Sequence, residues 1–575
     1  QIQLKAAFDH RHLFLDPNLD AEKSVAERDR LFALPRSSWD DYNKSLISDG
    51  GGIWPRSAKS IPLSPDVREW LGVEAEQMAP TELMHLILKA PADLLYNGGI
   101  GTYVKSSSQS HQDANDRGND NLRVDANELR VKVIGEGGNL GLTQKGRIEF
   151  ALGGGHLFTD AIDNSAGVDC SDHEVNIKIL LSGLVRGGDM TDKQRVALLS
   201  SMTDEVGQLV LSDNYQQTGA VSLEASMGFE MLNAHGQLIR KMEAAGALDR
   251  NIEFLPDDKN LAERAQMRVG LTSPELAVLL AYTKITLKEA ILATTLPDAP
   301  ELQQLLAEYF PAALVKQCSA EIPNHPLKRE IVTTQLVNRL VNRMGTCFTM
   351  QIGDETGADA AQIAAAWYAA SELLNGEATW REIEALDLAI PAAQQQSLMV
   401  ALRTMLGGAT RQILAAKSTG TPIATIIESY RAAIDKAVAA ARKDLSGLQA
   451  VEALLGASAS IIGVFELVDL AKATGKALEK VASTCAQLDA SLDLAWLGAA
   501  IDRLPANNRW QARARVQLAS EVRKLRQTLL QRSADGAEIA AGEAHGVIDE
   551  LKHNAPQDLA MLSAGLAEIK RILAA

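Results

Sequence analysis

One stretch of this chain, residues 131–171, constrains the fold more than any other. Its short apolar runs end directly in glycine-rich turns, as in VKVIGEGGNLGLTQ. An apolar run such as Val131–Ile134 is typical of a buried strand, and a glycine beyond the strand lets the backbone approach a ligand because glycine has no Cβ. In open parallel α/β sheets, ligands bind at these carboxyl ends of strands. The stretch therefore predicts a ligand site at strand ends, although each glycine alone could simply make a tight turn.

The same stretch carries two motifs in succession. EGGNLGLTQ is followed by DNSAGVDCSDHEVN at the start of a predicted helix. The pair resembles the glutamate dehydrogenase pattern of Glu-Gly-Ala-Asn before Pro-Thr, then Asn-Ala-Gly-Gly-Val and a serine three residues on. DLLYNGGIGTYVK and FDHRHLFLDPN, further upstream, are similar to the large, bacterial NAD-dependent class of that family. The resemblance implies a C-terminal fragment of an enzyme that passes hydride from L-glutamate to NAD and releases 2-oxoglutarate and ammonia.

The resemblance also implies roles for individual residues. Asn97 and Gly98 match the turn that borders the nicotinamide ribose, and Asn139 matches the asparagine whose amide pairs with the nicotinamide carboxamide. Asn164 and Ser171 match substrate-binding positions, with the Ser171 hydroxyl against the distal carboxylate of glutamate. These residues are the expected cofactor and substrate contacts.

At these positions the sequence departs in places from the family pattern, and some of the residues could have a purely structural role. The family alanine before the asparagine is Gly138 here, and Pro-Thr becomes Gly-Leu-Thr at 141–143, which leaves the loop contour open. Asn97 and the two glycines after it could make a purely structural turn. Ser171 could be an ordinary helix N-cap.

Asp16 is the candidate contact for the adenosine end of NAD. Residues 11–15 form a short apolar-rich run that ends in Asp16, and Pro17 then signals a turn. An acid at the end of the second strand of a dinucleotide fold binds the ribose hydroxyls and repels a 2′-phosphate, which favours NAD over NADP. The glycine-rich turn expected about 20 residues earlier would fall before Gln1. An Asp-Pro turn without a ligand is the alternative.

No catalytic residue and no metal site is assigned within the chain. In the resembled family, a lysine and an aspartate from an earlier substrate domain move the protons, so we expect them upstream of Gln1 and expect the fragment alone to be inactive. Asp172, His173 and Glu174 look like a metal or acid/base cluster. Neighbours along a helix point in different directions, which favours helix-start acids and a solvated histidine instead.

The amino-acid composition limits the binding partners and the cellular compartment that we expect for this protein. The chain holds 57 Lys plus Arg against 73 Asp plus Glu, a net charge of −16, which opposes binding to nucleic acid or to an anionic membrane. Apolar runs of about 18 residues and a signal peptide are both missing from the sequence, so no membrane partner is expected. The four cysteines form no CxxC pair, which argues against zinc or disulfide frameworks and fits the cytoplasm.

The expected fold class is α/β followed by all-α. Residues 1–160 are interpreted as the C-terminal part of a Rossmann-like NAD-binding domain, and residues 161–235 as helices that return to the substrate domain. Residues 236–575 are interpreted as an irregular helical domain, with two sub-bundles as one arrangement. Residues 105–127 are almost entirely polar and predict a flexible surface insertion.

Helical patterns dominate beyond residue 189. Apolar residues repeat at helical spacing in residues 273–292 and 325–345. Ser64 and Ser273 each precede a proline, which predicts an N-cap followed by the first helical residue. The size of this helical part makes homo-oligomer formation, or the binding of a small-molecule effector, a hypothesis for its role.

Two other functions remain as alternatives. A related amino-acid dehydrogenase with another side-chain specificity would replace the Ser171 contact with an apolar pocket. A non-catalytic helical regulatory or assembly module with a degenerate nucleotide fold would bind NAD without needing Asp16 or Asn139.

Overall fold

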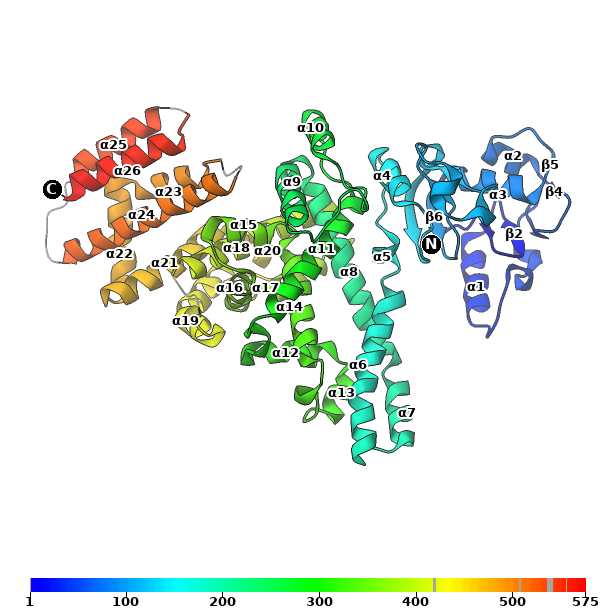
Figure 1. Ribbon diagram of the computed structural model, residues 1–575, viewed down its shortest axis with the longest axis horizontal. Coiled ribbons are helices and arrows are strands. Elements are labelled where there is room, and N and C mark those ends of the chain that lie inside the picture. The colour runs from blue at the N-terminus through cyan, green and yellow to red at the C-terminus, as the bar shows by residue number, and fades with distance from the viewer. Residues whose placement is uncertain (1, 417–419, 506–507, 535–540, 555, 575) are drawn as a thin grey trace. The chain divides into compact units, whose positions relative to one another are not determined.

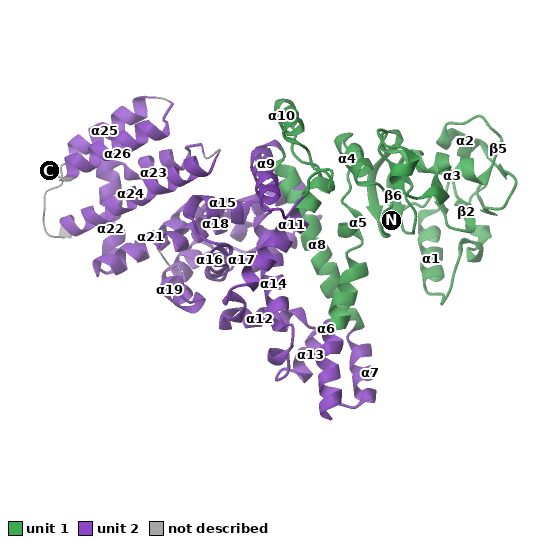
Figure 2. Cartoon of the chain, viewed as in Figure 1, with its two compact units in different colours: residues 1–175, 203–228, 249–279 green, residues 176–202, 229–248, 280–575 purple. Residues whose placement is uncertain are grey.

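The computed structural model describes residues 2–416, 420–505, 508–534, 541–554 and 556–574 (Figure 1). The chain forms two compact units (Figure 2). The first contains residues 1–175, 203–228 and 249–279, and the second contains residues 176–202, 229–248 and 280–575. The expected order, mixed α/β structure followed by helices, is confirmed.

The first unit holds the strands. They are β1 (Ala6–Phe8), β2 (His12–Leu15), β3 (Gly52–Pro55), β4 (Ile61–Pro62), β5 (Gln77–Met78), β6 (Ala92–Asn97), β7 (Val104–Lys105), β8 (Val124–Asp125) and β9 (Val131–Glu136). The sheet orders are β1-β2-β3, β4-β5, β6-β9 and β7-β8. The first two sheets are antiparallel, and the last two are parallel pairs.

The strand that ends before Asp16 does not lie in a parallel sheet. β2 pairs with β1 and with β3, and both pairings are antiparallel. Its Leu13, Phe14 and Leu15 are buried, so the predicted apolar strand is present. A run of apolar residues records burial but not the direction of the partner strands, which is why the sequence could not specify this pairing.

β6, the strand before Asn97, is largely exposed rather than buried. β6 runs beside β9 in parallel, with Asn97 opposite Glu136, and the described residues place no strand on its other side. Leu94 and Tyr96 are 40% and 66% exposed as a result. In β9, Ile134 and Glu136 are buried, whereas Lys132 and Val133 are exposed.

The first unit also contains helices, some of which connect the strands. They are α1 (Ala21–Phe32), α2 (Pro65–Leu71), α3 (Pro80–Leu88), α4 (Gln144–Leu152), α5 (Asp160–Asp163), α8 (Thr203–Met227) and α10 (Asp258–Met267). Two helices, α6 (Ala166–Gly187) and α11 (Ser273–Leu292), belong partly to each unit. The predicted cap at Ser64 is confirmed, because its side chain accepts a hydrogen bond from the backbone of Val67. Ser273 is instead the first residue of α11, since the carbonyl of Thr272 accepts from Leu276.

Residues 105–127 carry more structure than the surface insertion that we expected. Short 3-10 helices occur at His111–Ala114 and Arg117–Asn119. The Arg123 guanidinium is 3% exposed and donates to the Thr102 carbonyl at 2.8 Å, to Asp120 at 2.6 Å and to the Asp116 carbonyl. Leu122 and Val124 are also buried. One buried arginine, bonded to several backbone and side-chain oxygens, therefore organises a segment whose polar composition predicts disorder.

The second unit is helical throughout its described residues. Its helices are α7 (Asp192–Ser201), α9 (Phe229–Ala244), α12 (Gln303–Tyr309), α13 (Ala312–Gln317), α14 (Lys328–Met344), α15 (Phe348–Thr356), α16 (Ala360–Leu373), α17 (Gly376–Glu384), α18 (Ala392–Ala415), α19 (Ile423–Ala441), α20 (Gly447–Gly456), α21 (Ser458–Thr474), α22 (Leu478–Leu492), α23 (Leu494–Asp502), α24 (Arg509–Ala534), α25 (Ala541–His553) and α26 (Leu559–Ala574). The apolar face predicted for residues 325–345 is confirmed in α14 by buried Ile331, Val337, Leu340, Val341 and Met344.

The core of the helical unit has two well-packed regions. α16 packs against α18 and α19, with Trp367 only 1% exposed. Farther along the chain, α21 to α26 share a continuous apolar cluster. Within the described residues, no one helix is both long and apolar enough to span a bilayer, and the bent pair α20–α21 meets these criteria only when its two helices are counted together.

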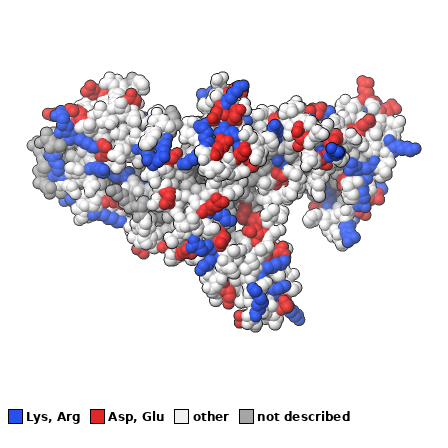
Figure 3. Space-filling model, in the orientation of Figure 1, with Lys and Arg blue, Asp and Glu red and all other residues white. Residues whose placement is uncertain are grey.

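The net negative charge is distributed rather than concentrated. On the face shown in Figure 3, acidic and basic side chains alternate over both units. Elsewhere among the described residues, opposite charges are also paired, as in Arg442 with Glu382 at 2.9 Å and Arg526 with Asp489 at 2.9 Å. This face therefore offers no extended basic surface of the kind that phosphate backbones require.

Replacing Trp367 with alanine should destabilise the helical unit. The loss of a fully buried tryptophan typically costs about 3–5 kcal/mol, since a cavity remains. A unit of this size should then unfold roughly 10 °C lower, at about 2–4 °C per kcal/mol. Scanning calorimetry measures the shift, and Trp510→Ala is the matched control because Trp510 is 72% exposed. Equal shifts for the two variants would contradict the core assignment.

Candidate functional site

The candidate site forms where β6 and β9 end. The two strands are parallel, so their carboxyl ends lie at the same edge, with Asn97 opposite Glu136. The turns that follow are in direct contact, since the Gly137 N–H donates to the Asn97 carbonyl at 2.8 Å. Two of the four expected cofactor contacts, Asn97 and Gly98, therefore adjoin the loop that carries another, Asn139.

Glycine is required where these two turns meet. A Cβ at Gly138 would lie 2.9 Å from the Gly99 carbonyl oxygen, and a Cβ at Gly141 would overlap the Asn97 amide nitrogen. Of the two departures from the resembled pattern, Gly138 therefore permits a close approach of two backbones, and Gly141 leaves room for the Asn97 side chain. Leu140 between them adopts a φ of 59°, a left-handed conformation that few side chains tolerate.

The structure brings the expected cofactor and substrate residues together. Asn164 Nδ2 donates a hydrogen bond to Asn139 Oδ1 at 3.0 Å. Asn164 ends α5 and lies against Gly167, where a Cβ would come within 3.1 Å of Asn164 Oδ1. Asn139 is exposed and Asn164 is half-buried, so the amide pair is open to a ligand on one side.

A buried ion pair supports the loop that carries Asn139. The Arg147 guanidinium, 4% exposed, binds both carboxylate oxygens of Glu136 at 2.7 and 2.9 Å, and Glu136 is fully buried. Burial alone would lower the pKa of Arg147, but the hydrogen bonds and charge of Glu136 outweigh it and raise that pKa. Glu136 Oε2 also accepts from the Leu142 N–H at 3.2 Å.

Two further acids complete this support. Asp160 forms an ion pair with Arg147 at 3.1 Å and accepts from the Leu140 N–H at 2.8 Å. Asp163 accepts from the Glu136 N–H at 2.9 Å. Burial, followed by the nearby charge of Glu136, raises the pKa of Asp163 to about 6. The sequence alone assigned no role to any of these charged side chains. Its one indication was that Asp160 and Asp163 lie just before Asn164, an expected substrate contact.

The Asn97 side chain has an unused hydrogen-bonding group. Its Oδ1 accepts from the Gly99 N–H at 3.4 Å. Its Nδ2 is buried and has no hydrogen-bond acceptor among the described residues. Buried polar groups are nearly always paired in native proteins, so a donor of this kind calls for an acceptor from a ligand or a water molecule.

Asp16 belongs to the antiparallel part of the first unit. It is 1% exposed, and its Oδ1 accepts from the Ser48 N–H at 3.1 Å and from the Ser48 hydroxyl. Its Oδ2 is buried and has no hydrogen-bond donor among the described residues. The contacts of Asp16 are thus with the loop before β3, while Asn97, Asn139 and Asn164 share the strand edge.

Ser171 lies inside a helix rather than at its start. α6 begins at Ala166, so the serine is the sixth helical residue and the alternative of an N-cap is wrong. Its side chain is exposed. The hydroxyl is therefore accessible from solvent, a few residues beyond Asn164.

The prediction of a solvated histidine beside Ser171 is also wrong. His173 is 1% exposed, and burial lowers its pKa. The sequence prediction compared it with Asp172 and Glu174, its immediate neighbours. The acid that shares a helix face with His173 is Asp169, one turn earlier. Its Oδ1 lies 4.0 Å from His173 Nε2.

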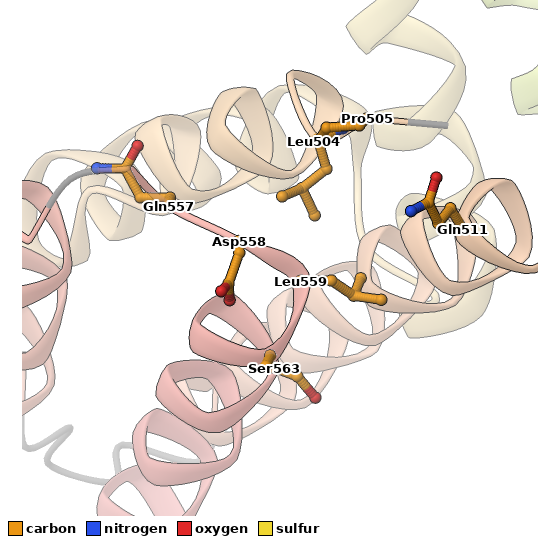
Figure 4. A pocket seen from close by; sticks show the side chains of 8 residues that line it. Leu504, Pro505, Gln511, Gln557, Asp558, Leu559 and Ser563 are labelled. Carbon is orange, nitrogen blue, oxygen red and sulfur yellow. The ribbon is translucent and has the colours of Figure 1, made fainter. Parts of the chain in front are cut away.

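The helical unit has an open hollow of its own. It has a volume of about 550 Å³ and lies between the end of α23 and the start of α26, with Leu504, Gln511 and Asp558 in its lining (Figure 4). Asp558 already accepts from the Met561 N–H at 2.8 Å as a helix cap. None of the candidate cofactor or substrate residues lines this hollow.

Comparisons with known proteins match both units. The model of the bacterial NAD-glutamate dehydrogenase catalytic domain matches residues 1–224, and that of the glutamate dehydrogenase C-terminal region matches residues 268–459 and 452–572. These models describe the dehydrogenase class that the strand-edge motifs predict. The chain belongs to the bacterial NAD-glutamate dehydrogenase family, which confirms the resemblance.

Curated relatives agree with this assignment. The NAD-specific glutamate dehydrogenase of Pseudomonas aeruginosa is 44% identical over 533 residues, covering 90% of this chain and 33% of the relative. That of Halomonas elongata is 43% identical over 533 residues with the same coverage, and that of Mycobacterium tuberculosis is 39% identical over 612 residues, covering 99% and 38%. The chain thus spans about a third of the length of the curated relatives it matches.

Replacing Arg147 with alanine should destabilise the first unit strongly. The change leaves the Glu136 carboxylate buried and uncompensated, which typically costs about 3–5 kcal/mol. Denaturant unfolding, followed by a probe in the first unit, measures the loss. Lys132→Ala is the control, since Lys132 pairs with Asp93 where both side chains are exposed, and little change is expected. A similar loss for both variants would show that the buried pair has no special role.

Proposed function

We propose that this chain supplies the nicotinamide side of the cofactor site, and part of the substrate site, of an NAD-dependent glutamate dehydrogenase. The observation that carries the proposal is the Asn164–Asn139 hydrogen bond at the strand edge formed by β6 and β9. This bond joins a residue expected at the cofactor to one expected at the substrate. Hydride transfer requires the cofactor and the substrate to lie side by side. The reaction is the oxidative deamination of L-glutamate to 2-oxoglutarate and ammonia.

The residues at the strand edge have the chemistry to hold a nicotinamide. NAD, when bound, accepts the hydride from the Cα of glutamate. A carboxamide carries both donors and an acceptor, and an asparagine amide pairs with it in both senses. Asn139 offers such an amide on an exposed loop, while the buried Nδ2 of Asn97 lacks an acceptor within the described structure. Gly98 is exposed and has no Cβ to obstruct a ribose.

Asp16 is proposed for the adenosine ribose, within a Rossmann-like arrangement of the cofactor domain. The support is its buried Oδ2, which has no donor among the described residues and is the acceptor that a ribose hydroxyl needs. Ser48 holds the other carboxylate oxygen and so fixes the orientation of the side chain. Such an acid would select NAD, since a 2′-phosphate would place negative charge against it.

Ser171 is proposed to bind the distal carboxylate of glutamate, beside Asn164. Its exposed hydroxyl can donate to a carboxylate oxygen, and a charge-assisted bond of this kind is stronger than a neutral one. L-glutamate and 2-oxoglutarate are therefore the proposed partners. Homo-oligomer formation, an effector site on the helical unit and a cytoplasmic location remain predictions.

Replacing Asn139 with alanine should weaken NAD binding and slow turnover. The change removes the carboxamide partner and also leaves Asn164 without its acceptor. We expect the KM for NAD to rise roughly tenfold, since a hydrogen bond of about 1.5 kcal/mol is lost. Steady-state kinetics of the natural protein that carries this chain measure it, with Gln112→Ala in the exposed 3-10 turn as control. Unchanged NAD kinetics would favour the non-catalytic helical module.

Replacing Ser171 with alanine should affect glutamate without affecting NAD. The loss of one hydrogen bond to a charged group, about 1.5–3 kcal/mol, predicts a fall of roughly 10- to 100-fold in kcat/KM for glutamate. Ser182→Ala, on the same helix, is the control. If the variant loses nothing on glutamate, or if the natural protein prefers an amino acid with an apolar side chain, the related amino-acid dehydrogenase becomes the better assignment.

A further inference from the structure

A second group of ligating side chains lies between α6 and α8, within the first unit. Asp169 and His173 are four residues apart on α6 and so lie on the same face of the helix. Asp213 comes from α8. Asn214 ties α8 to α5 and to the residue before α6, since its Nδ2 donates to the Ile162 carbonyl at 2.7 Å and to Ser165 Oγ at 3.0 Å.

The spacing of the three side chains suits a shared cation. One ligand atom from each lies within 4.8 Å of the other two. Each ligand atom lies about 2.1 Å from a bound Zn²⁺, so two ligand atoms at the tetrahedral angle are about 3.4 Å apart. The 4.0 Å between Asp169 Oδ1 and His173 Nε2 is somewhat longer than this separation, and it is too long for a hydrogen bond. Binding of the ion therefore requires the three side chains to move closer together.

The environment also favours a cation. His173 is 1% exposed and both carboxylates are half-buried, so water solvates the group poorly. Asp169 Oδ2 is buried and accepts no hydrogen bond from any described residue. A divalent ion would compensate the charge that burial penalises.

We propose that Asp169, His173 and Asp213 bind a divalent transition-metal ion, with Zn²⁺ the best match, which joins the start of α6 to α8. An imidazole nitrogen with two carboxylate oxygens suits Zn²⁺, whereas Mg²⁺ and Ca²⁺ prefer sites built from oxygen alone. Because Ser171 is two residues from Asp169, it faces roughly the opposite side of α6. The metal site therefore lies on a different face of α6 from the Ser171 hydroxyl, and the proposal does not depend on the proposed dehydrogenase function.

The test measures binding of Co²⁺, as a spectroscopic substitute, and of Zn²⁺ to the natural protein after dialysis against a chelator. The variants are Asp169→Asn and Asp213→Asn, which keep the shape of each side chain. We expect each to lose one equivalent of tight Zn²⁺ and the visible Co²⁺ absorption bands. Affinity should fall more than about 100-fold, beyond the 10- to 100-fold typical of groups outside the ligand set.

Glu174→Gln is the matched control, because it removes an exposed carboxylate from the same helix without touching the three ligands. It should bind Zn²⁺ as the unsubstituted protein does. Equal stoichiometry and equal Co²⁺ spectra in all four proteins would overturn the proposal. If an Asn variant fails to fold, zinc X-ray absorption of the unsubstituted protein decides: a first shell with one imidazole and carboxylate oxygens supports the site, and a shell without imidazole overturns it.

Discussion

The ion pair between Glu136 and Arg147 is the interaction on which the strand-edge site depends. Both charges are almost fully buried, a situation that is tolerated only when each is paired and its remaining hydrogen-bonding groups are used. Glu136 is the last residue of β9, so the pair fixes the point where the strand becomes a loop. Its second oxygen and Asp160 then bind backbone N–H groups farther along that loop. The loop is thus held by one buried and one half-buried acid, and the Asn139 side chain is left exposed.

Much of this site was predictable because its signals are local. A strand followed by glycine and asparagine can be recognised within a few residues, and the same holds for the cap at Ser64 and the apolar face of α14. The direction of strand pairing is not local, and β2 is antiparallel to its neighbours for reasons that its own four residues do not contain. Arg147 follows Glu136 by eleven residues across a loop, with no periodic pattern to link them. Arg123 was missed for the same reason.

His173 shows how sequence neighbours can mislead. Asp172 and Glu174 flank it, yet a helix turns each of them about 100° away from it. Asp169 shares its face, and the other acid, Asp213, comes from a different helix forty residues later. No pattern in the sequence joins α6 to α8 at that point. The burial of His173 depends on the packing of two helices, which is why sequence reasoning placed it in solvent.

The two amides at the strand edge are ordered before any ligand arrives. Asn139 and Asn164 share one hydrogen bond, which leaves donor N–H groups on Asn139 and acceptor capacity on Asn164. A partner with both a donor and an acceptor, such as a carboxamide, therefore fits the pair better than a carboxylate, which only accepts. Since their mutual hydrogen bond already restricts these two side chains, less conformational entropy is lost on binding. In the proposed function, such preorganisation would favour a single orientation of the nicotinamide ring, and that orientation would determine which face receives the hydride.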